Sequence, residues 1–396
     1  MDSLVQNANP KLQLTPTQFA AIEPNAYILS QLSQRPSSNG VPTRANAREQ
    51  FEFRDMTVTV GGFTHANGSS TVRIGDTSVV CGIVAEQIYT SEVPSWDVSQ
   101  ASVSANKRRR LASSGKTLLD NDEETDQAYD NEESRHIEDR CLLVPNVTMN
   151  TGCTPGYVPG APPSEDEQSI SNNLLGLLRS TRMIQAEDLR IWYQPPNLDA
   201  GESDSSNETQ LPELKAFWVL HIDIMVMSYG GNIFDAAWTA LVAALRHVTI
   251  PYAWWDVDKE IVLCSDDASK AHKLSLREMP TSCWFSVFEP QPRPASQDEV
   301  ARGSLGDGWW IFADPDGYEE SVCEENVWCV VSKDKNGKTR VYRAQNVGGS
   351  TVDSEVMHNL LQISAKKWED MKSIIDEVVA TGSPRAVAWK GKSYSA

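Results

Sequence analysis

The sequence has no long hydrophobic run and no secretory leader pattern in its first residues, MDSLVQNANPKLQL. A membrane-spanning helix needs roughly 20 consecutive apolar residues, and a signal peptide needs a basic start followed by an apolar stretch. We therefore expect a protein that is neither secreted nor associated with a membrane.

Cysteine pairs are missing as well. The seven cysteines are scattered and odd in number, and no two are spaced as Cys-x-x-Cys. Zinc sites and disulfide frameworks usually carry such a pattern. We therefore expect reduced thiols in a cytosolic or nuclear protein that holds no metal ion and no cofactor.

Positive charge is scarce, because the chain has 35 Lys and Arg against 54 Asp and Glu, a net charge of −19. Residues 91–139 carry −6 of this charge and residues 197–213 carry −5, which leaves −8 on the rest. An acidic body argues against a free-standing nucleic-acid binder with a broad basic face. Any contact with RNA would have to be local or shared with a partner chain.

Apolar and aromatic residues are plentiful, with 40% hydrophobic residues and 12 tryptophans in a chain of 396 residues. Such a chain can bury a sizeable core in one large or two medium domains. Tryptophan rings could stack on RNA bases, but most of them fall in predicted strands or helices, where burial in the core or in a subunit interface is favoured. The tryptophans concerned are Trp218, Trp238, Trp254, Trp255, Trp309 and Trp310.

The first half of the chain is rich in predicted strands. Residues 1–43 look like an N-terminal extension with a short helix. Residues 51–88 alternate between apolar and polar side chains, and a hairpin is expected to turn at Gly75 and Asp76. We place the first half of a folded domain at residues 44–250.

Two acidic stretches interrupt this half. The segment at about 91–139 is typical of a disordered insertion, and the loop 197–213 separates two predicted strands. A basic cluster inside the insertion is interpreted as a nuclear import signal, an RNA-contacting tether or a solvated run of charge. The cluster consists of Lys107, Arg108, Arg109 and Arg110.

The second half, residues 251–380, repeats the pattern of several strands followed by a helix. Strands are predicted at 282–289, 309–315, 326–333 and 339–347, with a turn at Asn336 and Gly337. The helix from Asp353 to Val379 has apolar residues at three- and four-residue spacing, so one face should pack on a sheet. The repetition predicts a duplicated α/β or α+β unit, with residues 381–396 as a C-terminal tail.

The stretch MSYGGNIFDAAWTALVAAL, residues 227–245, combines an apolar strand, a glycine turn and a helix. Backbone N–H groups at the start of such a helix can hold an anion, and glycine lets the anion come close. A further helix is predicted from Ser164 to about Met183, capped by Ser164 and acidic in its first turn. The glycine turn is therefore either a phosphate site or only a change of chain direction.

Four ordered motifs resemble the RNase PH family. They are FRDMTVTVGGFTHANGSSTVRIGDTSVVCGIVAE, HIDIMVMSYGGNIFDAAWTALVAAL, FADPDGYEES followed by NVWCVV, and the closing helix. The resemblance runs from about Arg44 to Val379, apart from the two acidic stretches, and is greatest to the ring subunits of the eukaryotic RNA exosome and their archaeal non-catalytic counterpart. It implies an α+β (α/β) RNase PH-like fold of duplicated strand-rich halves, similar to domain 2 of ribosomal protein S5.

Active members of this family bind inorganic phosphate and cleave RNA from its 3′ end by phosphorolysis. Their turn has the sequence Asp-Gly-Gly-Thr, commonly followed by Arg. Aligned on the Ala-Ala of the helix, the degenerate positions of this chain are Gly230, Gly231, Asn232, Ile233 and Phe234. Phenylalanine cannot replace a guanidinium as a phosphate partner, and isoleucine lacks the threonine hydroxyl.

The acidic pair that active members use is incomplete in this chain. Asp314 falls near the first acidic position, whereas Glu325 or Asn326 falls near the second. The basic residues that the family places early in the helix after Ser164 are also missing. The resemblance therefore implies that this chain has no catalytic residues.

Four further residues are interpreted locally. Arg179 and Arg182 fall where related ring subunits point basic residues toward the RNA path, with surface solvation as an equal alternative. Asp235 is interpreted as a partner of the helix dipole, and His221 as a hydrogen-bonded residue of the core.

The resemblance implies a non-catalytic structural subunit of the RNA exosome core ring. In such an assembly six RNase PH-like chains form three heterodimers, cap subunits cover the ring, and single-stranded RNA passes through the channel to a separate catalytic nuclease. It would support 3′-to-5′ RNA processing and decay, including that of ribosomal RNA, in the nucleus, nucleolus and cytoplasm. Ring closure requires every subunit, which explains why a member without chemistry is kept.

Three alternatives stay open. The chain could be an active phosphate-dependent 3′-to-5′ exoribonuclease, which would need arginine and acidic residues that it lacks. It could lend Arg179 or Arg182 to a composite site centred on a neighbouring subunit. It could also be an interaction adaptor unrelated to RNA.

Overall fold

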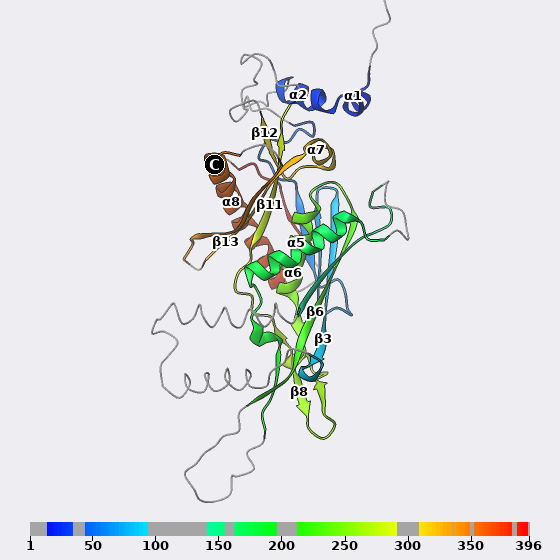
Figure 1. The fold of residues 1–396 in the computed structure, drawn as a ribbon, viewed down its shortest axis with the longest axis vertical. Coiled ribbons are helices and arrows are strands. Elements are labelled where there is room, and N and C mark those ends of the chain that lie inside the picture. The colour runs from blue at the N-terminus through cyan, green and yellow to red at the C-terminus, as the bar shows by residue number, and fades with distance from the viewer. Residues whose placement is uncertain are drawn as a thin grey trace, which may run out of the picture.

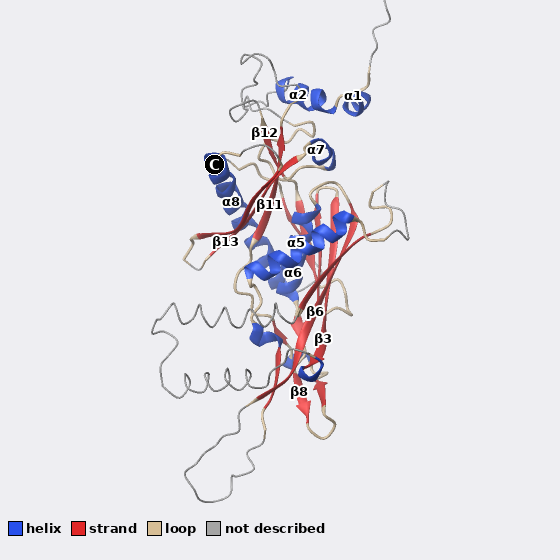
Figure 2. Cartoon of the chain, in the orientation of Figure 1, coloured by secondary structure: helices blue, strands red, loops and turns tan. Residues whose placement is uncertain are grey.

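The described residues of the chain form two main β-sheets with helices packed between and around them (Figure 1, Figure 2). The computed structural model describes residues 14–34, 44–93, 141–154, 162–195, 212–290, 309–334, 336–348, 352–381 and 386–394. The predicted insertion at 91–139, apart from its first three residues, and most of the acidic loop 197–213 lie outside them.

The first sheet is built from the N-terminal half of the chain, and a strand from the C-terminal segment forms one of its edges. Its strands follow the order β15-β1-β2-β3-β6-β4, with β5 also paired to β6. Every pairing is antiparallel except that of β4 with β6. The strands are β1 (Met56–Val60), β2 (Gly68–Ile74), β3 (Thr77–Tyr89), β4 (Leu143–Met149), β5 (Arg190–Tyr193), β6 (Glu213–Ser228) and β15 (Val387–Trp389).

The second sheet belongs to the C-terminal half and has the order β12-β11-β13-β14. Its strands are β11 (Thr281–Phe288), β12 (Trp310–Ala313), β13 (Glu325–Lys333) and β14 (Thr339–Val347). Two short ribbons complete the strands: β7 (Thr249–Ile250) with β10 (His272–Lys273), and β8 (Ala253–Asp256) with β9 (Ile261–Cys264). The predicted strands of this half and the β13–β14 hairpin are confirmed.

The helices include those that the sequence pattern predicts. Ser164 caps α5 through a capping box, and the closing helix, α8, extends a little beyond its predicted end. The helices are α1 (Pro16–Ile22), α2 (Pro24–Gln34), α5 (Glu165–Thr181), α6 (Ile233–His247), α7 (Gly317–Val322) and α8 (Ser354–Thr381), with the 3₁₀ turns η1 (Thr90–Glu92), η2 (Ala186–Leu189) and η3 (Ala268–Lys270). No helix in the described part of the chain is long and apolar enough to cross a membrane.

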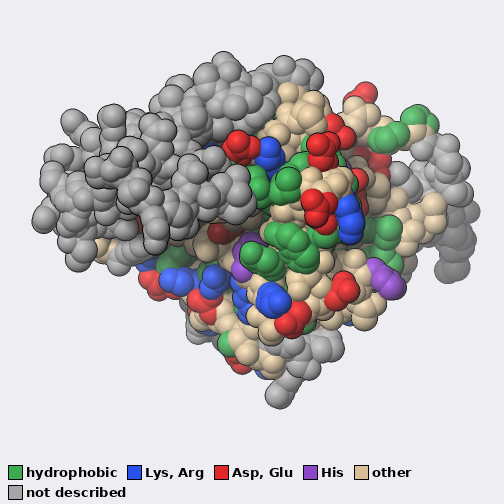
Figure 3. Space-filling view, turned by 90° about the horizontal axis from the view of Figure 1, so that it is seen from below, with side chains coloured by type: hydrophobic (Ala, Val, Ile, Leu, Met, Phe, Trp, Pro, Cys, Tyr) green, Lys and Arg blue, Asp and Glu red, His purple; other side chains and the backbone are tan. Residues whose placement is uncertain are grey.

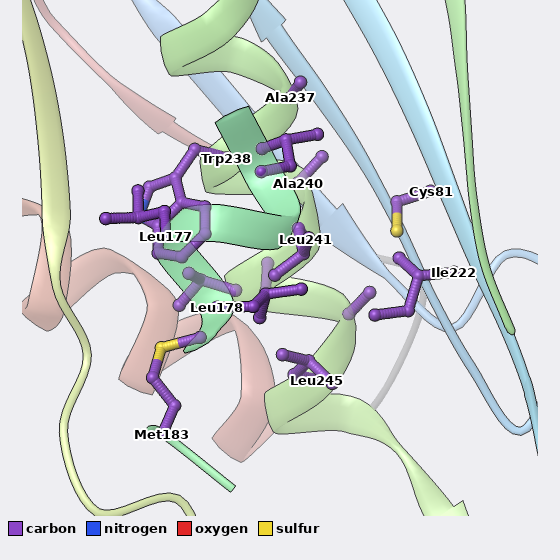
Figure 4. Packing of buried hydrophobic residues seen from close by; sticks show 14 of the residues in the cluster. Cys81, Leu177, Leu178, Met183, Ile222, Ala237, Trp238, Ala240, Leu241 and Leu245 are labelled. Carbon is purple, nitrogen blue, oxygen red and sulfur yellow. The ribbon is translucent and has the colours of Figure 1, made fainter. Parts of the chain in front are cut away.

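Helix α6 is the centre of the core. All residues from Ile233 to Leu245 are buried, and the helix packs on strands of both sheets and on α8. Figure 4 shows α6 between α5, which supplies Leu177 and Leu178, and the strands of the first sheet. A helix that is apolar all round must be covered on every side, so α6 joins the two halves into one core.

Small residues let α6 lie close to the first sheet. A Cβ at Gly68 of β2 would lie 2.4 Å from the side chain of Val248 and 2.8 Å from the carbonyl oxygen of Ala244. Alanines make up much of the helix, at positions 236, 237, 240, 243 and 244. The sequence pattern therefore fixes both the hydrophobicity of α6 and its short distance from β2.

Strand β6 is central, as predicted, and it is buried on both faces around Phe217 but on only one face from Leu220 onward. From Leu220 to Met227 buried residues alternate with residues that face outward. His221, predicted to be a core residue, has a side chain that is 41% exposed and lies 3.1 Å from the carboxylate of Glu86. That prediction is wrong because successive strand residues point to opposite faces of the sheet.

Described parts of both terminal segments, residues 14–34 and 386–394, are part of the folded body. Ile28 and Leu32 of α2 pack in a small apolar cluster with Trp310 and Phe312 of the second sheet. The segment 381–396 is predicted to be a tail, but its strand β15 pairs with β1 and extends the first sheet. The sequence gives no sign of this pairing, because the two strands are far apart in the chain.

Replacing Leu241, fully buried in α6, with alanine should lower the free energy of unfolding by about 2–5 kcal/mol, because it removes apolar contacts and leaves a cavity between α6 and the first sheet. Urea unfolding of the full chain measures the change. Ile22 of α1 is 63% exposed, so Ile22→Ala is the matched control and should change stability by less than about 0.5 kcal/mol. Equal effects of the two substitutions would contradict a core centred on α6.

Candidate functional site: the turn before helix α6

The turn between β6 and α6 is covered by another loop of the same chain. Gly231 has φ +95°, and a Cβ there would lie 2.4 Å from the carbonyl carbon of Asp316 and 2.7 Å from the carbonyl oxygen of Pro315. Gly317 N–H donates to the carbonyl oxygen of Gly230 at 3.0 Å. Glycine is therefore required at position 231 by the approach of the chain's own backbone.

Arg54, just before β1, fixes the turn from its other side. Its Nη1 and Nη2 donate to the carbonyl oxygens of Gly230 and Gly231 at 2.7 and 3.1 Å. Its Nε and Nη2 also form a fork on Asp314, at 2.9 Å to Oδ2 and 2.8 Å to Oδ1. The guanidinium is thus fully engaged inside the protein, in a bidentate pair with a carboxylate.

Asp314 is an ion-pair partner in this structure. Burial opposes ionisation of its carboxyl, but the charge of Arg54 and the hydrogen bonds from it outweigh burial and hold the pKa of Asp314 well below its usual range. Asn232 Nδ2 also donates to Asp314 Oδ1 at 2.8 Å. A carboxylate held in this way is a poor proton donor at neutral pH.

The backbone N–H that would face an anion is taken by Glu320 of α7. Asn232 N–H donates to Glu320 Oε2 at 3.1 Å, and the Tyr229 hydroxyl donates to the same oxygen at 2.7 Å. Burial raises the pKa of Glu320, opposed by the hydrogen bond from Tyr229. Burial, together with the Glu320 charge, raises the pKa of the Tyr229 hydroxyl.

Glu320 is an acidic residue of the turn that the sequence pattern did not identify, and with Asp314 it forms an acidic pair, so the prediction that this pair is incomplete is wrong. Asn326 accepts hydrogen bonds from Trp284 Nε1 at 3.1 Å and Ser286 Oγ at 2.7 Å within the second sheet. The structure thus brings Glu320, and neither Glu325 nor Asn326, to the turn beside Asp314. The adjacent pair of glutamates after Asp316 was the available signal, because Asp316 caps a helix that points Glu320 at the turn.

Ile233 and Phe234 replace the polar part of the active motif with an apolar cluster. Both side chains are buried. The Phe234 ring lies 4.4 Å from that of Trp328 and 6.5 Å from that of Trp284, centroid to centroid. Where active relatives place a guanidinium, this chain has an aromatic group of three rings.

Asp235 does more than interact with the helix dipole. Its Oδ1 accepts from Ser282 Oγ at 2.5 Å, and its Oδ2 accepts from the backbone N–H of Trp284 at 3.1 Å. Buried Lys367 of α8 lies 3.4 Å from the same carboxylate. Burial alone would lower the pKa of Lys367, but nearby groups that include Asp235 outweigh burial. The pKa of Lys367 is therefore raised, and the ammonium stays charged.

The segment before β1 contributes two more arginines to the loop that covers the turn. Arg44 and Arg48 lie 3.1 and 3.3 Å from Glu319 Oε2. Burial lowers the pKa of Arg44 to about 10, and burial also raises the pKa of Glu319 against the charge of Arg44. Both guanidinium groups are paired with Glu319 of the same chain, whereas Arg44 Nε is buried with no hydrogen-bond partner among the described residues.

The predicted RNA-contacting residues lie at the end of α5. Arg179 is exposed in the last turn, and Arg182 is half-buried at the C-cap with φ +46°. Neither takes part in the contacts around the turn. The basic cluster Lys107–Arg110 lies outside the described residues.

Within the described residues there is no group of three or more His, Cys, Asp or Glu side chains arranged to hold a metal ion. The carboxylates of Asp314 and Glu320 are both occupied, by Arg54 and by the Tyr229–Asn232 pair.

Comparisons with known proteins agree with this architecture. The RNase PH model, described as 3′ exoribonuclease family, domain 1, matches residues 52–251. Exosome complex component rrp43 of Schizosaccharomyces pombe is 25% identical over 90% of this chain and 97% of its own length. Exosome complex component Rrp42 of Methanothermobacter thermautotrophicus is 27% identical over 66% and 74%.

Solved structures share the fold. The Archaeoglobus fulgidus exosome with RNA bound to the active site superposes with a TM-score of 0.52 at 19% identity, over 88% of this chain and 96% of the other. An archaeal exosome core gives a TM-score of 0.50 at 18% identity, over 89% and 96%. The predicted RNase PH-like α+β fold is confirmed.

Asp314→Asn should lower the free energy of unfolding by about 3–5 kcal/mol at about pH 7, because it leaves Arg54 buried without its counter-charge. The folded-state pKa of Asp314 is lowered, so its stabilisation is present above about pH 4 and is lost as the pH falls below that value. The difference in the free energy of unfolding between the variant and the wild type, measured by urea unfolding, should therefore be smaller at about pH 3 than at about pH 7.

The control for this prediction is Asp376→Asn, which removes a half-exposed carboxylate 2.7 Å from Arg246. A surface pair of this kind contributes about 0–1 kcal/mol. A loss for Asp314→Asn no larger than for Asp376→Asn would show that the Arg54 pair does not hold the turn.

Proposed function

The chain belongs to the RNase PH family of 3′ exoribonucleases, and on that basis we propose that it is a non-catalytic structural subunit of an RNA exosome core ring. Its relatives named above are exosome components. In this proposal the chain joins other RNase PH-like subunits in a six-membered ring, beneath cap subunits. The ring guides single-stranded RNA to a nuclease that is a separate polypeptide.

One observation carries the proposal: the turn that would hold phosphate is filled by the chain's own groups. Glu320 accepts the hydrogen bond from Asn232 N–H, and the loop at Asp316 touches the Gly231 backbone. An inorganic phosphate would have to displace both.

The aromatic cluster supports the same proposal. Phe234 packs against Trp328, and the Arg343 guanidinium lies 3.9 Å from the centre of the Trp328 ring. This cluster stabilises the second sheet where an active enzyme needs an exposed cation. Fold alone does not give function, so the filled turn is what argues against catalysis.

Two alternatives are tested by the same reconstituted ring. An active phosphate-dependent exoribonuclease needs a free anion site in this chain. A composite site needs Arg179 or Arg182 to reach the active site of a neighbouring subunit. Both residues lie at the end of α5, away from the filled turn, and this position is compatible with such a contact. Localisation in the nucleus, nucleolus and cytoplasm is part of the proposal and requires imaging of the tagged chain.

The purified chain should release no nucleoside diphosphate from 3′-labelled RNA in millimolar phosphate, because Glu320 and the covering loop occupy the anion position. Thin-layer separation of the products reads the result, and an active RNase PH enzyme is the positive control. Release of nucleoside diphosphates by this chain alone would make it a phosphorylase. Assembly of the ring should fail when this chain is omitted.

In the assembled ring, replacing Arg179 and Arg182 with alanine should weaken RNA binding equally for all sequences and reduce the magnitude of the slope of log affinity against log salt by about 1.4. The physical reason is the loss of two phosphate contacts. Fluorescence anisotropy over a salt series measures both quantities. Unchanged affinity and slope, with the ring intact, would mean that neither arginine contacts RNA.

A further inference from the structure

The β8–β9 hairpin carries apolar side chains on both of its faces. On the inner face, the Trp255 ring lies 6.2 Å from that of Tyr89, and the Lys215 ammonium lies 5.6 Å from the centre of the Trp255 ring. Val262 is buried on the same side. These contacts attach the hairpin to the end of the first sheet.

The outer face has no such cover among the described residues. Tyr252 and Trp254, two positions apart on one face, are 51% and 38% exposed, and their rings stack at 6.1 Å with an angle of 24° between planes. Ile261 is 39% exposed and Val257 at the tip is 55% exposed. Figure 1 places β8 at one end of the molecule, and Figure 3, viewed from that end, shows hydrophobic side chains gathered on the surface.

A solvent-exposed face of this kind needs an explanation. An isolated two-stranded ribbon is marginally stable in water, and it would be expected to turn a polar face to solvent. Tyrosine and tryptophan are the side chains that most often anchor protein interfaces, whereas single exposed apolar residues carry no such meaning. The stacked pair on the outer face therefore points to a macromolecular partner.

Charge decides which class of partner fits. Between Tyr252 and Lys270 the chain has two lysines, and one of them, Lys259, is 3.7 Å from a carboxylate of the hairpin itself. The acidic residues in the same span are Asp256, Asp258, Glu260, Asp266 and Asp267. A net negative rim repels RNA phosphates, although stacked rings alone would suit bases. It suits a protein surface with a lysine or arginine rim.

We propose that the outer face of the β8–β9 hairpin is a docking surface for a neighbouring protein subunit. The partner presents an apolar cleft that takes Tyr252 and Trp254, rimmed by basic residues that face Asp258 and Glu260. The identification of the partner as another subunit of the exosome ring rests on the proposed function. The apolar face and its acidic rim are features of the structure and do not depend on that proposal.

The test uses the full chain and the other recombinant ring subunits. Hydroxyl-radical footprinting of the wild-type chain should show Trp254 oxidised when the chain is alone and protected at least about fivefold when the ring forms without RNA. Trp254→Glu and Tyr252→Glu should each weaken association with one adjacent subunit at least about tenfold, measured by mass photometry. Ile22→Glu, at an exposed apolar residue of α1, is the matched control.

The outcomes separate the two proposals. If the wild-type chain does not enter the ring at all, the proposed function fails. If the ring forms while Trp254 stays reactive, or the two hairpin variants associate as the control does, the docking surface is overturned. Protection of Trp254 only after RNA is added would overturn it in favour of base stacking. Circular dichroism melting checks that the variants are folded, and the footprint does not depend on them.

Discussion

A single guanidinium holds together the three chain segments that meet before helix α6. Arg54 leads into the first sheet, Asp314 follows a strand of the second sheet, and Gly230 and Gly231 follow β6. A buried charge must be paired and hydrogen-bonded. If any one of these segments moved away, buried hydrogen-bonding groups on the other two would lose their partners. The Arg54–Asp314 pair therefore couples the two halves, and α6 starts from the junction that it makes.

The same constraint decides what the glycine turn can do. A helix start with free N–H groups is an anion site, but here Asn232 N–H is satisfied by Glu320 and the turn carbonyls are satisfied by Arg54 and Thr77. The hydrogen-bonding groups of this turn are therefore used within the fold of the chain itself.

Local patterns in the sequence were sufficient to predict most of the helices and strands. The cap at Ser164, the turn at Gly337 and the long closing helix each depend on residues near one another in the chain. The β15–β1 pairing and the exposed face of His221 depend on which distant segment covers which surface. No alternation of apolar residues contains that information.

The site was predictable only in part, because some of its residues are close together in the sequence and others come from distant segments. The altered residues Ile233 and Phe234 are visible in the sequence, but Arg54 and Glu320, which fill the turn, come from segments far along the chain. Their roles follow from three-dimensional contact alone. The altered motif identifies the position of the turn, and the structure identifies the groups that fill it.

The aromatic cluster at Phe234 also limits which side chains position 234 can accept. Trp284 and Trp328 stand opposite each other on β11 and β13, and both contact Phe234. An arginine at position 234 would place a charge in a buried space shaped for a ring, beside a turn already closed by Glu320. Such a substitution would lower the stability of the fold whatever it did to anion binding, because the charge would be buried without a partner.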